Sequence, residues 1–335
     1  MKTVIAAIAL LMAAGLLQPA DAAPGKIKPK PANVAKPAPA RPSGVQAVRD
    51  LIYARPVSGH PLTLDIYQPQ RAPKDFPRPV VIFIHGGNWN SGDARQGGGF
   101  NDFPAILTSV AAQGYVVASI NYRFSGEAPF PAPVQDAKTA VRWLRAHAAD
   151  YNIDTTRVAL WGEEAGGQIA ALVATGCGVS SLAPEGPRDD NAPSDCVQAV
   201  IDWHGIHDLA GMTMGEDGKP LPVPTPEGTY LGCEPAQCAP GVVRAASPMA
   251  YIGPNTPPFL IQHGSHKTVP LVQSQKLFDA LRRAHVPVEY VTYADGETDV
   301  ASRAMDKVAA FLAQTFPRKP INKKPPRITS NALPY

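Results

Sequence analysis

Short apolar runs that alternate with segments of helical spacing constrain the fold of this chain more than any other feature. Val80-Val81-Ile82-Phe83-Ile84 is apolar at five consecutive positions, as in a strand covered on both faces. Residues 133–151 instead repeat apolar residues at helical spacing. We predict further strands over 62–67, 115–120, 158–161, 197–203, 258–263 and 288–293, and further helices over 102–114, 271–283 and 300–316. This alternation predicts an α/β fold with a mostly parallel central sheet and helices on both faces.

Residues 1–22 have the pattern of a signal peptide. Met1-Lys2 is a short basic start, residues 4–17 form an apolar run, and Ala20-Asp21-Ala22 offers small residues for cleavage. The apolar run is shorter than the ~20 residues that span a bilayer, so we expect export and no transmembrane span. The mature protein is then periplasmic or extracellular.

Both ends of the mature chain are basic and rich in proline. Residues 23–44 are predicted to be a Pro/Lys-rich linker, and residues 317–335 a basic Pro-rich tail, on either side of a domain over 45–316. Each end carries five basic residues and no acid, whereas the whole chain has a net charge of only +3, so the domain itself is acidic. The tails are either solvated segments or contacts to an anionic envelope surface. No basic helix or aromatic strip indicates nucleic acid as a partner.

The chain has four cysteines, an even number that predicts two disulfides in an oxidising compartment. Three pairings are open. We favour Cys177 with Cys196 and Cys233 with Cys238, because each pair brackets a loop rich in proline, glycine and aspartate. Neither spacing is the short CxxC of zinc ribbons, so no metal site is predicted there. His204, His207 and Asp208, which follow a predicted strand, are a second candidate metal site, and no metal is predicted there either.

Two motifs carry a resemblance to a known family. His85-Gly86-Gly87-Asn88-Trp89, directly after the strand at 80–84, resembles the oxyanion-hole motif of α/β-hydrolase esterases, and Trp161-Gly162-Glu163-Glu164-Ala165-Gly166-Gly167 resembles their nucleophile elbow. Segments 122–124, 140–144 and 257–264 are similar to secreted bacterial carboxylesterases of the feruloyl-esterase-like branch. The resemblance covers residues 45–316. It implies an α/β-hydrolase fold and serine-based hydrolysis of carboxylic esters without a cofactor.

The elbow departs from this family at its most important position. Gly162 and Gly166 flank a sharp strand-to-helix turn, and the residue at its apex is Glu164 instead of serine. Ala165, Gly86 and Gly87 are expected to offer backbone N–H groups to the space above the apex, as an oxyanion hole does. Beside a carboxylate, these donors would meet an anion that is already in place.

The acid and the histidine of the expected catalytic triad are also replaced. The loop that should supply the acid, residues 263–270, has Lys267 and no carboxylate. The loop that should supply the histidine, residues 293–300, has Thr298, and no histidine follows His285. A serine hydrolase needs a hydroxyl, an imidazole and a carboxylate that orients it, so conventional catalysis is predicted to be absent. A nucleophilic Glu164, or acid–base work by Glu163 and Glu164 together, remains as an alternative.

Three functions follow from these observations. The first is a non-catalytic relative of a secreted esterase, whose pocket binds a small molecule or an acylated carbohydrate. The second is an active hydrolase of carboxylic esters that uses a non-standard site. The third is an envelope-associated interaction protein that works through its basic tails.

Overall fold

The computed structural model describes residues 44–57, 59–70, 76–186, 189–214, 219–264, 268–294 and 300–317. These residues all belong to one compact unit of the chain. The predicted signal peptide, nearly all of the linker and nearly all of the basic tail lie outside the described residues, as do Lys267 and Thr298. In the part that is described, no helix is long and apolar enough to cross a bilayer.

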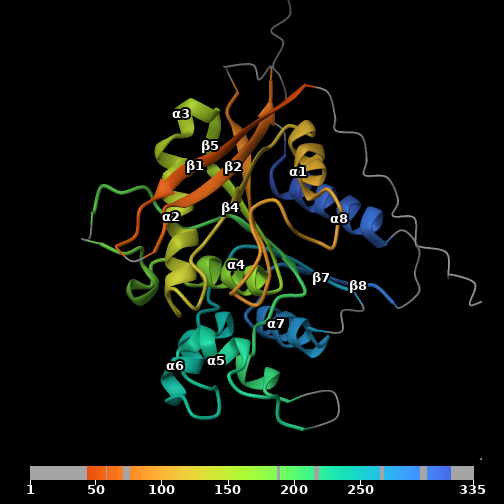
Figure 1. Cartoon of the computed structure of the whole chain (residues 1–335). Coiled ribbons are helices and arrows are strands. Elements are labelled where there is room, and N and C mark those ends of the chain that lie inside the picture. The colour runs from red at the N-terminus through yellow and green to blue at the C-terminus, as the bar shows by residue number, and fades with distance from the viewer. Residues whose placement is uncertain are drawn as a thin grey trace, which may run out of the picture. The chain divides into compact units, whose positions relative to one another are not determined.

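A single eight-stranded sheet forms the centre of the domain, in the order β1-β2-β4-β3-β5-β6-β7-β8 (Figure 1). β1 pairs with β2 and β2 with β4 in antiparallel fashion, and every later pairing is parallel. The predicted α/β fold with a mostly parallel sheet is therefore confirmed. The strands are β1 (Val45–Ala54), β2 (Leu62–Pro69), β3 (Arg78–Ile84), β4 (Val116–Ile120), β5 (Ile153–Glu163), β6 (Ala199–Trp203), β7 (Phe259–His263) and β8 (Val288–Thr292).

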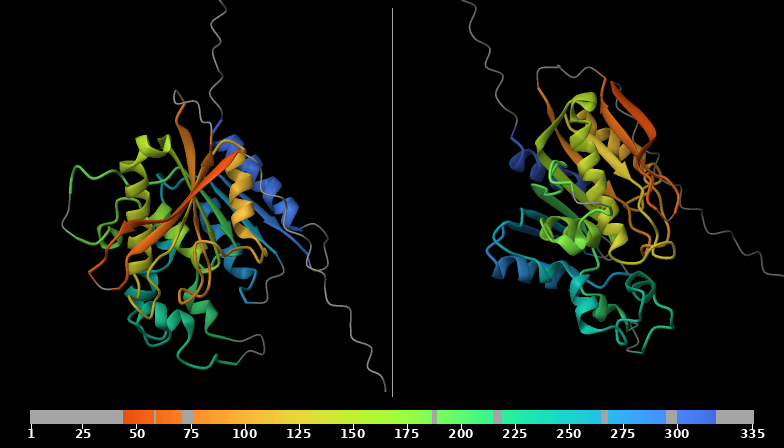
Figure 2. Two further views of the ribbon diagram at one scale, coloured as in Figure 1. Left: turned by 45° about the horizontal axis from the view of Figure 1, so that its top comes forward. Right: turned by 90° about the vertical axis from the view of Figure 1, so that its left-hand side faces the viewer.

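Helices cover both faces of this sheet, as Figure 2 shows from two further directions. α1 and α8 pack on one face through apolar side chains such as Leu107 and Leu312, while α2, α4 and α7 pack on the other through Val141, Ile169 and Leu277. Because each helix buries one apolar stripe, the sheet separates two hydrophobic cores. The helices are α1 (Phe103–Ala112), α2 (Ala132–Ala146), α3 (Ala148–Tyr151), α4 (Ala165–Thr175), α7 (Val272–Arg283) and α8 (Val300–Thr315).

The carboxyl ends of the parallel strands bring distant segments to one edge of the sheet. β3 leads into His85, β5 into Glu164, and β6 into His204. Ligands of open α/β sheets bind at this edge. The fold therefore places the two sequence motifs side by side.

The connection between β6 and β7 contains a short helix, α5 (Pro226–Leu231), and α6 (Pro240–Ala245) follows it. Thr225 caps α5, since its Oγ1 accepts a hydrogen bond from Gly228 N at 2.9 Å. In Figure 1 both helices lie at the lower end, near α4 and α7. The disulfide Cys233–Cys238 closes the turn between them.

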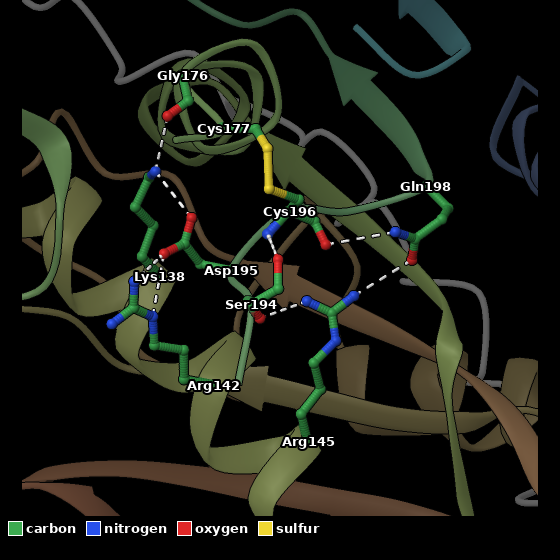
Figure 3. Close-up of a disulfide and its surroundings, with 9 residues drawn as sticks. All are labelled: Lys138, Arg142, Arg145, Gly176, Cys177, Ser194, Asp195, Cys196 and Gln198. Carbon is green, nitrogen blue, oxygen red and sulfur yellow. Dashed lines mark hydrogen bonds and ion pairs between the residues drawn. A yellow bond between two sulfur atoms is a disulfide. The ribbon is translucent and has the colours of Figure 1, made fainter. Parts of the chain in front are cut away.

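A second disulfide, Cys177–Cys196, joins the end of α4 to the segment before β6. Both disulfides, Cys177–Cys196 and Cys233–Cys238, are the pairs that the sequence analysis favoured. Figure 3 shows cations from α2 reaching the same segment. Lys138 Nζ donates to Asp195 Oδ1 at 3.0 Å, and Arg142 Nε donates to Asp195 Oδ2 at 3.0 Å. Lys138, Arg142 and Asp195 are called the α2 clamp below.

Candidate active site

The apex of the strand-to-helix turn between β5 and α4 is Glu164, and its backbone is strained. Its φ of 52° and ψ of −114° lie outside the regions that residues with a side chain normally adopt, which costs about 1–3 kcal/mol. Hydrogen bonds hold it there. Glu164 N donates to Trp203 O at 2.9 Å, and Gln168 N donates to Glu164 O at 3.1 Å. The turn presents the Glu164 side chain at the carboxyl edge of the sheet.

Two glycines make this turn sterically possible. A Cβ on Gly162 would lie 2.1 Å from Gly166 O, and a Cβ on Gly166 would lie 2.1 Å from Ile84 O. Real Cβ contacts do not approach so closely, so any larger residue at either position would force the backbone apart. Their close packing brings the elbow against the end of β3.

The carboxylate of Glu164 lies against the backbone of the loop after β3. Its Oε2 accepts hydrogen bonds from Gly87 N at 2.6 Å and from Asn88 N at 3.2 Å. A Cβ on Gly86 would be 2.7 Å from the same oxygen, so Gly86 supplies space to the carboxylate. Among the described contacts, neither Gly86 N nor Ala165 N donates to it. Asn88 was missed as a donor, although it follows the two glycines directly.

The loop that carries these amides is braced from both sides. His85 stacks on Tyr122 with ring centroids 4.5 Å apart, and Tyr122 Oη donates to His85 O at 3.1 Å. Trp89 Nε1 donates to Gln168 Oε1 at 3.1 Å, which links the loop to α4. Burial lowers the pKa of His85 to about 4, against the opposing effect of its hydrogen bond to Gly86 O. His85 is therefore neutral near pH 7 and acts as a brace.

Glu163, the last residue of β5, has a separate set of partners. Its Oε2 accepts a hydrogen bond from Gly98 N at 2.5 Å, and its Oε1 lies 3.6 Å from His204 Nε2. Adjacent carboxylates thus point to two different loops. Sequence reasoning proposed Glu163 and Glu164 as a pair but did not place Gly98 or His204 near them.

A cavity of about 440 Å³ opens beside both carboxylates. Small-molecule sites in proteins have volumes of roughly 300–1,000 Å³. The lining contains both glutamates, one arginine and the rings of His85 and Phe100. It consists of His85, Gly86, Gly87, Ser91, Gly92, Arg95, Gln96, Gly97, Gly99, Phe100, Asn101, Glu163 and Glu164.

A third carboxyl group, that of Glu227 on α5, lies within the electrostatic reach of Glu164. Glu227 is 3% exposed. Burial raises its pKa to about 7, and the negative charges of Glu164 and Glu234 contribute in the same direction. Burial, followed by the charge of Glu164, also raises the pKa of Tyr122. No sequence signal pointed to Glu227, because it lies 63 positions after Glu164 in the chain.

Two described histidines close to the site have structural partners. His263 Nδ1 is 2.8 Å from Ser274 Oγ, and its Nε2 donates to Val269 O at 3.0 Å. His207 Nε2 is 3.0 Å from Asp202 Oδ2, and both side chains are fully buried. Neither geometry presents an imidazole to Glu164. Within the described residues, no group of three or more potential ligands could hold a metal ion.

Comparison with known proteins identifies the family of this chain. The family model described as BD-FAE matches residues 64–281. The chain belongs to the BD-FAE family. Esterase LipQ of Mycobacterium tuberculosis is 31% identical over 237 residues, which cover 70% of this chain and 52% of LipQ. The probable carboxylic ester hydrolase LipM of the same organism is 27% identical over 262 residues, 74% of this chain and 57% of LipM. The chain thus spans about half the length of the curated relatives it matches.

Solved structures extend the comparison to the fold. A truncated form of a carbohydrate esterase from gut microbiota aligns with a TM-score of 0.65 and 26% identity, over 81% of this chain and 96% of that one. The thermophilic esterase Est2 of Thermogutta terrifontis aligns with a TM-score of 0.63 and 26% identity, over 84% and 96%. This chain is therefore an esterase-like α/β-hydrolase.

Proposed function

We propose that this protein is a non-catalytic member of its esterase family, which retains the cleft as a binding site and does not hydrolyse esters by the serine mechanism. The observation that carries the proposal is the position of Glu164 Oε2, 2.6 Å from Gly87 N and 3.2 Å from Asn88 N. An oxyanion hole stabilises an ester only if the carbonyl oxygen can enter it. Here a permanent carboxylate oxygen of the protein takes that place.

Moving the Glu164 carboxylate away from the amides of Gly87 and Asn88 would cost free energy. Hydrogen bonds to a charged group contribute roughly 1.5–3 kcal/mol each, and Glu164 accepts two of them. An ester carbonyl is neutral and forms weaker bonds with the same donors, so it would not displace the carboxylate. The substitutions at Lys267 and Thr298 support the same proposal, because a base and its orienting acid are missing from the expected loops.

The test is hydrolysis of a panel of short-chain nitrophenyl and feruloyl esters by the purified protein and its Glu164→Ala and Glu164→Ser variants. We expect no turnover by the wild type or by Glu164→Ala. For Glu164→Ser we expect ester hydrolysis at most roughly 10³–10⁴-fold faster than in water, because the oxyanion hole would act without a general base. Glu289→Gln, prepared in the same way, is the control for contaminating esterases, because Glu289 is an exposed partner of Lys307. Wild-type turnover that disappears in Glu164→Ala would overturn the proposal.

That contrary outcome corresponds to the second candidate, a carboxylic-ester hydrolase with a carboxylate mechanism. Its support is Glu227, whose pKa of about 7 suits a general acid or base, beside the charge of Glu164. Turnover lost in both Glu164→Ala and Glu227→Gln would favour this candidate. Turnover that depends on neither residue would point to an impurity.

We further propose that residues 1–22 direct export and that the tails at 23–44 and 317–335 flank a domain over 45–316. The disulfides are compatible with an oxidising compartment. Fractionation of cells that express the full chain, and of a variant without both tails, tests this. Loss of the envelope-bound fraction in the tail deletion would assign the tails a binding role, and retention of the protein in the cytoplasm would contradict export.

A further inference from the structure

A second cavity, of about 470 Å³, has Cys196 of the Cys177–Cys196 disulfide in its lining and shares no lining residue with the cavity beside the elbow. Small-molecule sites have volumes of roughly 300–1,000 Å³, so this cavity has room for an organic ligand. As far as the chain is described, its lining holds no carboxylate. The polar residues of the lining are Arg145, Thr155, Thr156, Ser194 and Gln198. One guanidinium therefore sets the sign of the charge in this cavity.

Arg145 is held in the lining by uncharged acceptors. Its Nε donates to Thr155 O at 3.0 Å, its Nη1 donates to Ser194 O, and its Nη2 donates to Gln198 Oε1 at 3.4 Å. Figure 3 shows the last two contacts, from Arg145 to Ser194 and to Gln198. Because all three acceptors belong to lining residues, the guanidinium is part of the cavity wall. No ion pair of Arg145 occurs within the described ranges.

The neighbouring carboxylate does not neutralise Arg145. Lys138, Arg142 and Arg145 are spaced at i, i+4 and i+7 and so lie on one face of α2. Asp195 pairs with the first two, at 3.0 Å from Lys138 Nζ and 2.5 Å from Arg142 Nη2. Burial lowers the pKa of Arg145, and the charge of Asp195 opposes this effect without cancelling it. Three cations beside one carboxylate leave a net positive charge next to the cavity.

Asp154, a carboxylate on β5, has its own partners. Its Oδ2 lies 2.7 Å from Arg157 Nε, and its Oδ1 accepts a hydrogen bond from Thr156 Oγ1 at 2.6 Å. The charge of Asp154 is thus offset by Arg157. The Thr156 hydroxyl already uses its proton and is not counted as a donor below.

Other donors around the guanidinium remain unused. A guanidinium has five N–H groups, and the contacts of Arg145 use one on each nitrogen. One N–H on Nη1 and one on Nη2 therefore lack an acceptor in the part of the chain that the structure describes. The exposed Thr155 has a hydroxyl that none of its described contacts uses. Ser194 Oγ accepts from Cys196 N at 3.1 Å, which leaves its own proton to donate.

We propose that this cavity binds a small organic phosphate or sulfate monoester, whose anionic group is held by Arg145 with the hydroxyls of Thr155 and Ser194. These donors come from α2, from β5 and from the segment before β6. A phosphate monoester has three terminal acceptor oxygens, which suit donors from three segments better than the two oxygens of a carboxylate do. Its charge also balances the guanidinium, with which it forms strong paired hydrogen bonds. The site does not include Glu164, so it is independent of whether the elbow hydrolyses esters.

The experiment is isothermal titration calorimetry of the full protein with glucose 6-phosphate and glucose 6-sulfate, beside glucuronate, glucose and inorganic phosphate. Arg145→Gln removes the charge, Arg145→Lys keeps the charge without the fork of donors, and Thr155→Val removes the hydroxyl with little change of shape. Arg283→Gln is the matched control, because it removes an exposed arginine of α7. Thermal unfolding of each variant verifies that it is folded.

We expect the wild type to bind at least one of the two esters, at least about tenfold more tightly than glucuronate, glucose or inorganic phosphate. Affinity for that ester should fall at least about tenfold in Arg145→Gln, less in Arg145→Lys, about threefold in Thr155→Val, and not at all in Arg283→Gln. Absence of ester binding, equal binding of any of the three comparison compounds, or an equal loss in Arg283→Gln would overturn the proposal. If Arg145→Gln is unfolded, unchanged affinity in both Arg145→Lys and Thr155→Val would overturn it.

Discussion

Asp195 and Glu164 are both shielded carboxylates, and they are stabilised in opposite ways. Asp195, 5% exposed, accepts hydrogen bonds from two cations of α2, Lys138 and Arg142. Glu164 accepts hydrogen bonds from two uncharged amides. Removing a charge from water is offset most fully by an opposite charge with good geometry. The comparison indicates that the α2 clamp is a closed ion-pair unit, whereas the described hydrogen bonds of Glu164 come from uncharged backbone amides.

The surroundings of the two carboxylates fit this difference. The α2 clamp fixes the segment that the Cys177–Cys196 disulfide already ties to α4, as Figure 3 shows. Lys138 also donates to Gly176 O at 2.8 Å, next to that disulfide. The elbow instead borders a cavity of about 440 Å³. A ligand can reach Glu164, but Asp195 has its protein partners around it.

The largest effect is expected for Asp195→Ala, which leaves Lys138 buried without its counterion. Lys138 is 1% exposed, so we expect a loss of about 3–5 kcal/mol in the free energy of unfolding. Urea unfolding with both disulfides intact measures it. Glu289→Ala breaks an exposed pair as the control and should cost at most about 1 kcal/mol. Equal losses in the two variants would mean that the α2 clamp contributes no more than a surface ion pair.

A pH-dependent effect is expected for Glu227→Gln. The folded-state pKa of Glu227, about 7, is higher than its ordinary value of 4.5, so the unfolded chain releases this proton first as pH rises. The negative charge of Glu227 therefore lowers the free energy of unfolding. This loss is absent at pH 4, grows from about pH 4.5 to pH 7, and reaches its full size above pH 7. It amounts to about 3 kcal/mol, because each pKa unit corresponds to about 1.36 kcal/mol. Glu227→Gln should therefore be more stable than the wild type at pH 8 and equally stable at pH 4, by urea unfolding at both values. A difference that is the same at both pH values would disprove this titration.

A smaller effect is expected from Glu164→Ala, which empties the space beside Gly87 N and Asn88 N. These donors should then bind an external carboxylate, so we expect butyrate to bind at least about tenfold more tightly than to the wild type. Calorimetry measures this gain, and Glu164→Gln is the control because its amide oxygen can still occupy the hole. Tight binding of butyrate by the wild type would show that Glu164 leaves the hole readily, and the contrast with Asp195 would be lost.

Most of the sheet could be predicted because its parallel strands are buried on both faces and read as apolar runs. β3 is an example, since every residue from Pro79 to Ile84 is buried. β1 was not predicted as a strand. It lies at the edge of the sheet and exposes polar residues such as Arg49 and Asp50, so its pattern is weak. The short helix α5 was missed for a similar reason, because six residues show little periodicity.

The candidate site, like the sheet, has one part that the sequence predicted and another part that it did not. The spacing of Gly162, Glu164 and Gly166 is local, and it identified the apex of the turn from the sequence alone. The partners of the acidic side chains come from elsewhere in the chain. Gly98 and Glu227 carry no motif, and the segment around His204 was not linked to the elbow. Only the folded protein shows that Gly98 and His204 contact Glu163 and that Glu227 lies within the electrostatic reach of Glu164.

The sequence by itself determined that the glycine pattern of a sharp strand-to-helix turn surrounds Glu164, and it predicted that this carboxylate stands at the nucleophile position. Only the tertiary structure decided where that carboxylate lies. Gly87 N is 77 positions away from Glu164 in the chain, and the parallel pairing of β3 with β5 brings the two together. The strained backbone of Glu164 then directs Oε2 toward the amides of Gly87 and Asn88. A distance of this kind depends on strand register and loop packing, which no local residue pattern specifies.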